Sequence, residues 1–510
     1  QYGNLGQNFS SSNNVALVTG AGSLWTNALD LFIGGQGSGN RLTVSNAGTV
    51  ANAAGVVGSS SIGNGNEVVV TGTNSFWTNA LDLTIGNSGS SNSMTVSNGG
   101  MVASGIGYIG NTNTASNNSV LVTGTNSLWT NTGNLYVGNF GSGNNLVISN
   151  GGTVAGGNGY FGYTSTASNN TVLVTGSNSL WTNSGNLTVG NNGSGNSMVI
   201  TNGGTVTSAT GSLGSLGTAT GNSALVTGAG SSWGTLASSL YVGDAGSNNL
   251  LTVADGGSVS TGPGAALYVG NTGSGNRLVV SNGGTATAGN SYLGYGATAS
   301  NNTALVTGAG STWTNFGVLL VGREGGNNNL VVSNGGTVTA SGFDTSAIGF
   351  ASDNNSVLVT GSNSLLSVTG GGTTLIVGYD GASNSLVIAD GGRVLSISGI
   401  IGFTNTAGLA IDNSALVTGA GSRWDNVNGL FVGFKSGNST LTVADGGTVD
   451  AGFTFDIASQ AGSSGTLNIG GFGTNDAAGT INAPKITFGA GTGTINFNQS
   501  NATTISAVIS

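Results

Sequence analysis

The sequence predicts an all-β fold, a right-handed parallel β-helix (solenoid) with about 26 residues per rung, and two repeated motifs lead to this prediction. The first is the tripeptide Val-Thr-Gly, whose early copies are spaced by 52 residues. Its valines are Val18, Val70, Val122, Val174, Val226, Val306, Val359 and Val417. The second is an Asn-Gly-Gly-like turn between these copies. Its first residues are Asn46, Asn98, Asn150, Asn202, Asp255, Asn282, Asn334, Asp390 and Asp445.

The 52-residue repeat is a pair of related units. Aligning the two motif series places Val44 on Val18 and Val50 on Leu24. One extra half is inserted where Asp255 and Asn282 stand 27 residues apart, so about 26 residues is the structural unit. Such a unit cannot bury its own apolar edges, and stacking on its neighbours buries them, with crossovers that favour the right hand. We count 17 rungs, which at about 4.8 Å each predict a rod roughly 80 Å long.

Short alternating runs inside each unit predict the strands. The run from Leu135 to Val137 is typical, because its first and third residues stay aliphatic in the other copies while the middle one varies. The glycine that follows, Gly138 in this copy, is suited to turn the chain with a positive φ. We therefore expect Tyr136 to be exposed. The residues that we expect to be buried are Val44, Val96, Leu135, Val137 and Val174.

The composition excludes several kinds of chemistry. The chain has no histidine and no cysteine, which removes zinc fingers, haem ligation and thiol or histidine-based nucleophilic catalysis. Seven scattered cations do not make a surface that tracks nucleic-acid phosphates. No apolar run approaches the roughly 20 residues of a membrane-spanning helix. We expect no catalytic, metal or cofactor site and no nucleic-acid partner.

Residues 118–154 carry the complete repeat, in which a Val-Thr-Gly strand, a Ser-x-Trp step, a Leu-Tyr-Val-Gly strand and an Asn-Gly-Gly turn follow one another. This repeat resembles the one shared by the passengers of type V-secreted autotransporters and by PEP-CTERM-type surface proteins. The resemblance covers about residues 14–450 and weakens afterwards. We therefore divide the chain into a β-solenoid repeat domain, residues 1–450, and an irregular continuation of the solenoid, residues 451–510.

The resemblance implies an extracellular protein, exposed on a bacterial cell surface or shed from it. It also implies a precursor with a signal peptide and an outer-membrane β-barrel, neither of which this sequence contains. Two functions remain open. One is a structural stalk or self-assembling surface fibre, which the regularity of the repeat favours. The other is an adhesin that binds a glycan or a host surface protein.

Catalysis is the weaker hypothesis, because lyases and hydrolases with a β-helix fold need clustered carboxylates or a basic residue in a groove. Asp255, Asp390 and Asp445 take the place of the turn asparagine and are expected to serve as turn residues. Asp30 and Asp82 recur at one position without a cation or a third carboxylate. Arg423 and Lys435 stand alone. We expect that the protein is not an enzyme.

A tryptophan follows seven of the Val-Thr-Gly valines at a distance of seven residues, and Leu366 takes the eighth place. Because alignment places the Leu24 position inward, the tryptophans are expected to point outward or into a corner. Packing over small residues such as Ala51 is one hypothesis, and an aromatic contact stripe for a glycan or a partner chain is the other. The tryptophans are Trp25, Trp77, Trp129, Trp181, Trp233, Trp313 and Trp424.

The repeat begins almost at Gln1, without a polar cap, and strand-like sequence continues to Ser510. Open strand edges invite pairing. We therefore expect molecules, or further segments of the same chain, to meet end to end. The residues expected to take part are Tyr2, Leu5, Ile495, Phe497, Ile505 and Ile509.

Overall fold

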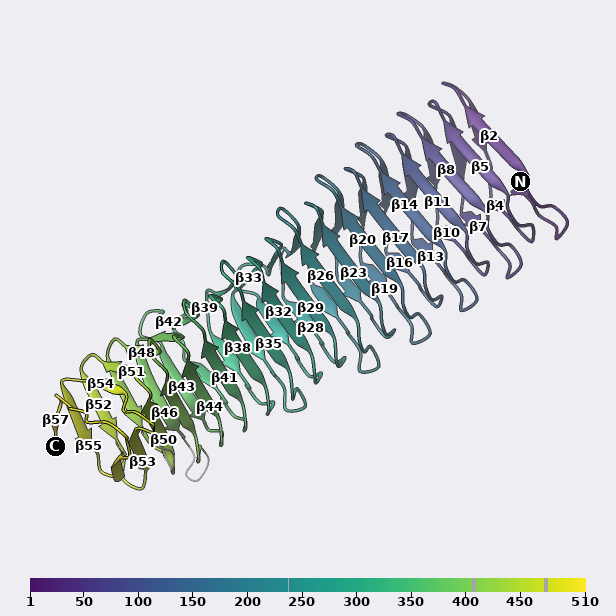
Figure 1. The fold of residues 1–510 in the computed structure, drawn as a ribbon. Helices are drawn as coiled ribbons and strands as arrows, with labels where there is room; N and C mark the ends of the chain where they lie inside the picture. Colours follow the sequence, from purple (N-terminus) through teal and green to yellow (C-terminus); the bar gives the residue numbers. More distant parts are fainter. Residues whose placement is uncertain (237, 406–409, 472–475) are drawn as a thin grey trace. The chain divides into compact units, whose positions relative to one another are not determined.

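The computed structural model describes residues 1–236, 238–405, 410–471 and 476–510, and its chain divides into two compact units. Unit 1 comprises residues 1–240, 244–252 and 256–259, and unit 2 comprises residues 241–243, 253–255 and 260–510. In both units short strands lie side by side in parallel, as Figure 1 shows. Within the described ranges no helix is long and apolar enough to cross a membrane.

One 52-residue repeat of unit 1 illustrates the architecture. Its strands are β14 (Ser119–Thr123), β15 (Leu128–Asn131), β16 (Leu135–Val137), β17 (Asn145–Ser149), β18 (Thr153–Gly156) and β19 (Gly159–Phe161). β14 pairs with β17 in sheet B, β15 with β18 in sheet C, and β16 with β19 in sheet A, and all three pairs are parallel. Three strands thus form one rung, and Val122 is in register with Ile148, 26 residues later.

Unit 2 repeats this arrangement. Its strands β35 (Thr303–Thr307), β36 (Thr312–Asn315) and β37 (Leu319–Val321) pair in parallel with the equivalent strands of the next rung. Together the described residues form about 19 turns of a parallel β-solenoid, so the predicted fold class is confirmed. The sequence count of 17 missed β53 (Ser464–Ile469) and β56 (Thr492–Phe497), which carry neither motif. The predicted boundary at residue 450 stays a prediction.

The interior is aliphatic, as the alternating runs predicted. The five residues expected to be buried have exposed fractions of 0–1%, which confirms the strand register in sheets A and B. The prediction for Tyr136 is wrong in degree. Its side chain is outward but half-buried, because its ring stacks between those of Tyr108 and Tyr160 on the neighbouring rungs.

The predicted orientation of the tryptophans is wrong. Val50 is in register with Trp25, not with Leu24, whose side chain is 62% exposed. The turn before Trp25 holds one residue more than the turn before Val50, and a shift of one residue exchanges the two faces of a strand. Trp25 itself is half-buried on β3 (Leu24–Thr26). The other six tryptophans are buried, with exposed fractions of 0–1%: Trp77, Trp129, Trp181, Trp233, Trp313 and Trp424.

The buried indoles explain why two rungs make one repeat. A Cβ on Gly107 would lie 2.8 Å from Cζ2 of Trp129, which belongs to the following rung, and a Cβ on Gly159 would lie 2.8 Å from Cζ2 of Trp181. Such an approach is closer than packed carbon atoms tolerate. A rung with tryptophan in sheet C therefore follows a rung with glycine at the start of its sheet-A strand, and the two kinds alternate.

A ladder of buried asparagines connects successive rungs at the start of sheet B. The backbone N–H and the Nδ2 of Asn118 both donate to Oδ1 of Asn144, at 2.9 and 3.1 Å, and Asn144 donates in the same way to Asn170. In unit 1 the ladder consists of Asn14, Asn40, Asn66, Asn92, Asn118, Asn144, Asn170, Asn196, Asn222 and Asn249. In unit 2 it consists of Asn276, Asn302, Asn328, Asn355, Asn384 and Asn413.

The glycine at the end of each sheet-A strand makes room for this ladder. Gly138 has a φ of 74°, as expected for a turn glycine, and a Cβ there would lie 2.3 Å from Nδ2 of Asn170. The position thus requires glycine for two reasons, its backbone conformation and the buried amide of the next rung.

Replacing Asn144 by alanine tests the ladder. The variant leaves two buried N–H donors of Asn118 without an acceptor, so we expect the free energy of unfolding to fall by about 2–4 kcal/mol. Urea unfolding followed by circular dichroism measures the change. Asn113→Ala is the matched control, because Asn113 is exposed. Equal stability of the two variants would show that the ladder does not hold the rungs together.

Candidate functional site

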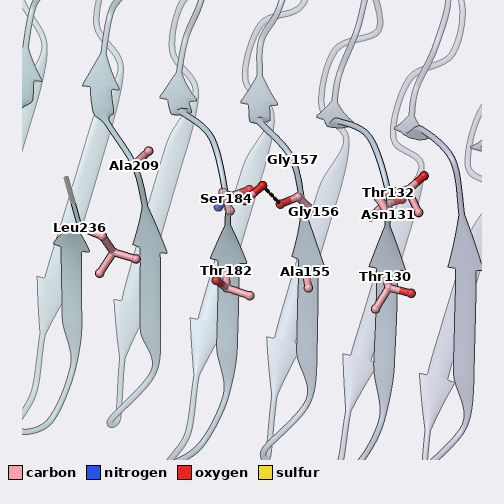
Figure 2. Close-up of a pocket in the computed structure, with 11 residues that line it drawn as sticks. Thr130, Asn131, Thr132, Ala155, Gly156, Gly157, Thr182, Ser184, Ala209 and Leu236 are labelled. Carbon is pink, nitrogen blue, oxygen red and sulfur yellow. Dashed lines mark hydrogen bonds between the residues drawn. The ribbon is translucent and has the colours of Figure 1, made fainter. Parts of the chain in front are cut away.

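A groove of about 490 Å³ lies in unit 1 where the strands of sheet C end, and Figure 2 shows the residues that line it. It extends over β15, β18, β21 (Leu180–Asn183) and β24 (Thr205–Ser208). The lining is neutral and consists of Thr130, Asn131, Thr132, Ala155, Gly156, Gly157, Thr182, Asn183, Ser184, Ala209 and Leu236. The two adjacent glycines, Gly156 and Gly157, contribute no side chains to this surface.

The last residues of the sheet-C strands form an inward polar column below the groove. These residues serve the indole of the following rung and the amide beyond it. In one rung Asn52 accepts from Nε1 of Trp77 at 2.8 Å and donates to Oδ1 of Asn79 at 2.7 Å. In the next pair Ser104 accepts from Nε1 of Trp129 at 3.4 Å and donates to Oδ1 of Asn131 at 2.8 Å.

Gly156 interrupts this column. It occupies the position of Asn52 and Ser104 and is in register with Asn183, but it offers no side chain. Nε1 of Trp181, Oδ1 of Asn183 and Nδ2 of Asn131 are buried there and have no hydrogen-bond partner within the described chain. Unpaired buried polar atoms are costly and require an explanation. We call the space left by the missing side chain the Gly156 notch.

A second feature is a set of tyrosine stacks on the outer face of sheet A. In unit 1 the rings of Tyr108, Tyr136 and Tyr160 stack with centroids 5.2 and 5.3 Å apart. In unit 2 Tyr241, Tyr268 and Tyr292 stack at 4.8 and 5.1 Å. The recurrence of tyrosine at the middle position of these strands was visible in the sequence, but it was interpreted only as exposed variation.

The stacks are built for cohesion rather than for display. Each inner ring uses both faces against its neighbours, and Tyr163 and Tyr295 cover the edges at 5.0–5.3 Å. A ligand that stacks on an aromatic side chain needs a free ring face, and here mainly edges remain. Burial, followed by the charges of the neighbouring tyrosines, raises the pKa of Tyr268 to about 12, while Arg323 opposes this shift.

The predicted contact stripe of tryptophans does not exist on the surface. Six of the indoles lie in the core, because the phase of sheet C differs from the predicted one, and they are not available to a glycan or a partner. Packing over small residues, the other hypothesis for these tryptophans, describes their environment, although the small residues are glycines of sheet A.

The residues expected at end-to-end contacts lie at unpaired or terminal strands. Tyr2, Phe497 and Ile509 are 56, 54 and 45% exposed. Leu5, Ile495 and Ile505 are half-buried.

The aspartates have structural roles. Asp255, Asp390 and Asp445 have φ values of 50–52°, as turn residues do. Oδ1 of Asp30 accepts from the N–H of Ala54 at 3.1 Å, and Oδ1 of Asp82 from that of Ile106 at 3.0 Å. Within the described ranges no three potential metal-ligating side chains from His, Cys, Asp or Glu form a group.

Arg423 is not isolated, contrary to the sequence interpretation. Its guanidinium pairs with Asp425 at 3.0 Å and with Asp450 at 2.7 Å, and Arg393 pairs with Asp425 at 2.5 Å. Successive rungs of sheet C bring these residues together. Burial alone would raise the pKa of Asp425, but the hydrogen bond from Arg393 and the nearby charges lower it below its ordinary value. The cluster joins three rungs.

Comparison with known proteins gives no family. No family model matches the chain, and no curated protein matches it. One matching solved structure is that of a TibC-catalysed, hyper-glycosylated fragment of TibA, with 13% identity over 100% of both chains and a TM-score of 0.23. A score this low transfers no property of that fragment to this chain.

The raised pKa of Tyr268 predicts how stability depends on pH. The folded state favours the neutral phenol, so its contribution is complete below about pH 10 and is lost as the pH rises towards about 12. The tyrosinate absorbance should therefore include a late step that is missing in Tyr268→Phe, and this variant should lose less stability over the same interval. Tyr268→Leu, which also removes the ring, should be less stable at neutral pH. A titration of all tyrosines near pH 10 would contradict the position of this hydroxyl.

Proposed function

We propose that the chain is an extracellular structural element, a stalk or surface fibre of the autotransporter-passenger type that its repeat resembles, and that it is not an enzyme. The protein would set a distance between a bacterial surface and whatever lies beyond it. Its length would be adjusted in steps of one repeat, because each 52-residue segment is a complete pair of rungs.

The observation that supports this proposal most is the use of inward polar groups to join rungs. The asparagine ladder joins the rungs where sheet B begins. At the following turn Oγ of Ser179 donates to the carbonyl oxygen of Thr175 at 2.7 Å and accepts from the N–H of Gly151 of the preceding rung at 3.0 Å. These side chains would contribute stability along the direction of stacking, which is the property that a spacer needs.

The binding-module alternative has one specific observation in its favour, the neutral groove above the Gly156 notch. It no longer has the tryptophan stripe as support. A glycan or a surface protein recognised by this molecule would contact the groove rather than the indoles.

Deletion of residues 119–170 tests the spacer proposal. The deletion removes one 52-residue repeat together with part of the groove, and it places Asn118 directly before Thr171, where Asn170 stood. We expect the β-sheet circular dichroism spectrum to persist and the maximum dimension from X-ray scattering to fall by about 10 Å, two strand spacings.

Deletion of residues 119–157 is the control, because it removes one and a half rungs and breaks the register. This variant should be strongly destabilised. A well-folded 119–170 deletion that no longer supports attachment of the cells that carry it would favour the binding module over the spacer.

The fibre form of the proposal depends on unpaired strand edges. In the described chain β1 (Gly3–Leu5), β2 (Val15–Thr19) and β3 each pair on one side only, and so does β56 in unit 2. Pairing these edges would supply several backbone hydrogen bonds, each contributing about 0.5–1.5 kcal/mol.

We expect the mass measured by light scattering to rise with protein concentration, and Phe497→Lys to reduce this rise because it places a charge beside the β56 edge. Phe497 is 54% exposed. Phe343→Lys is the matched control, since Phe343 is 85% exposed and lies outside the strands. A constant monomer mass at all concentrations would refute the fibre.

A further inference from the structure

We propose that the Gly156 notch is a binding site for one hydroxyl oxygen that does not belong to the protein. This oxygen would accept a hydrogen bond from Nε1 of Trp181 and donate one to Oδ1 of Asn183. Both side chains are buried, with exposed fractions of 0 and 1%, and both atoms have no partner within the described chain. The proposal goes beyond the structural role and does not depend on it.

Other rungs of the same protein show which chemical group completes this arrangement. Oγ of Ser396 accepts from Nε1 of Trp424 at 3.2 Å and donates to Oδ1 of Asn426 at 2.8 Å. Ser104 does the same between Trp129 and Asn131. A hydroxyl is therefore the group that an indole N–H and an amide oxygen at this spacing hold together, and at residue 156 the chain does not supply it.

The orientation of Asn183 is consistent with a missing donor at residue 156. Its Nδ2 donates to the carbonyl oxygen of Thr207 on the following rung at 3.4 Å, which leaves Oδ1 for the preceding rung. Oδ1 of Asn131 is occupied by Ser104, so its unpaired Nδ2 is a second donor beside the notch. Three polar atoms meet the usual requirement of two to four partners for a buried water oxygen.

The notch has room for this oxygen. The nearest atoms to a Cβ on Gly156 would be the carbonyl oxygen of Gly133 at 3.3 Å and Cβ of Asn131 at 3.6 Å. The backbone of Gly156 does not have a positive φ, so a side chain is compatible with its conformation. A serine at this position would thus reproduce the arrangement at Ser104.

Two sources can supply the hydroxyl, a water molecule or a neutral saccharide that lies in the groove of Figure 2. The groove lining carries hydroxyls and methyl groups of Thr130, Thr132 and Thr182 and no charged side chain, so it suits a neutral hydroxylated molecule rather than an ion. Crystals grown without sugar and titrations with sugar distinguish the two sources.

The test uses the whole chain. We expect a crystal structure at a resolution that shows ordered water to contain an oxygen within hydrogen-bond distance of Trp181 Nε1 and Asn183 Oδ1, replaced by Ser Oγ in Gly156→Ser. In parallel, the indole N–H signals are followed by NMR during titration with glucose and with galactose, and Trp181→Phe assigns the signal.

A water in the crystal without a sugar-induced shift identifies water as the source. A saturable shift of the Trp181 signal that Gly156→Ser abolishes identifies the saccharide. Ser104→Gly is the reciprocal variant, and it should create a second such oxygen between Trp129 and Asn131. An empty notch in the crystal together with an unshifted Trp181 signal in both titrations overturns the proposal.

Discussion

The buried asparagine ladder is the constraint on which the rest of the structure depends. An amide that has left water must have its polar atoms paired, and each Oδ1 is paired by two N–H groups from the preceding rung. This double bond of one rung to the next fixes the register at the start of sheet B. It also dictates the glycine that ends each sheet-A strand, because any Cβ at Gly138 would overlap the amide of Asn170. The spacing of about 26 residues follows from keeping both requirements in every rung.

Volume imposes the second period. The core between the sheets is filled at the density of packed organic solids, so an indole added to one rung must be offset by atoms removed from the next. Gly107 beneath Trp129 and Gly159 beneath Trp181 supply this offset. The half-unit between Asp255 and Asn282 carries no tryptophan, and there the strict alternation stops. The 52-residue repeat is therefore a packing rule added to a 26-residue hydrogen-bonding rule.

Sequence reasoning recovered what depends on period and missed what depends on turn length. Alternation placed Leu135 and Val137 in the core, because residues two apart share a face. It failed for the tryptophans, since one extra turn residue exchanged the faces of sheet C. The asparagine ladder was also missed, although Asn118, Asn144 and Asn170 recur at 26 residues. Asparagine is common in turns, and only the strand register shows that these are buried. The Gly156 notch likewise becomes visible only when Gly156 is aligned with Ser104.

A ladder in which every inward polar group serves its neighbours makes sites in an unusual way. Removing one side chain leaves unpaired atoms on the adjoining rungs, at Trp181 and Asn183, rather than on the altered residue. Those rungs do not close the gap, because the backbone ladders of sheets A and B hold them at their spacing. A single glycine is therefore sufficient to open a polar site in a surface without loops. Regularity, which favours a spacer as the role of the whole chain, is thus also the condition that makes one interruption able to bind.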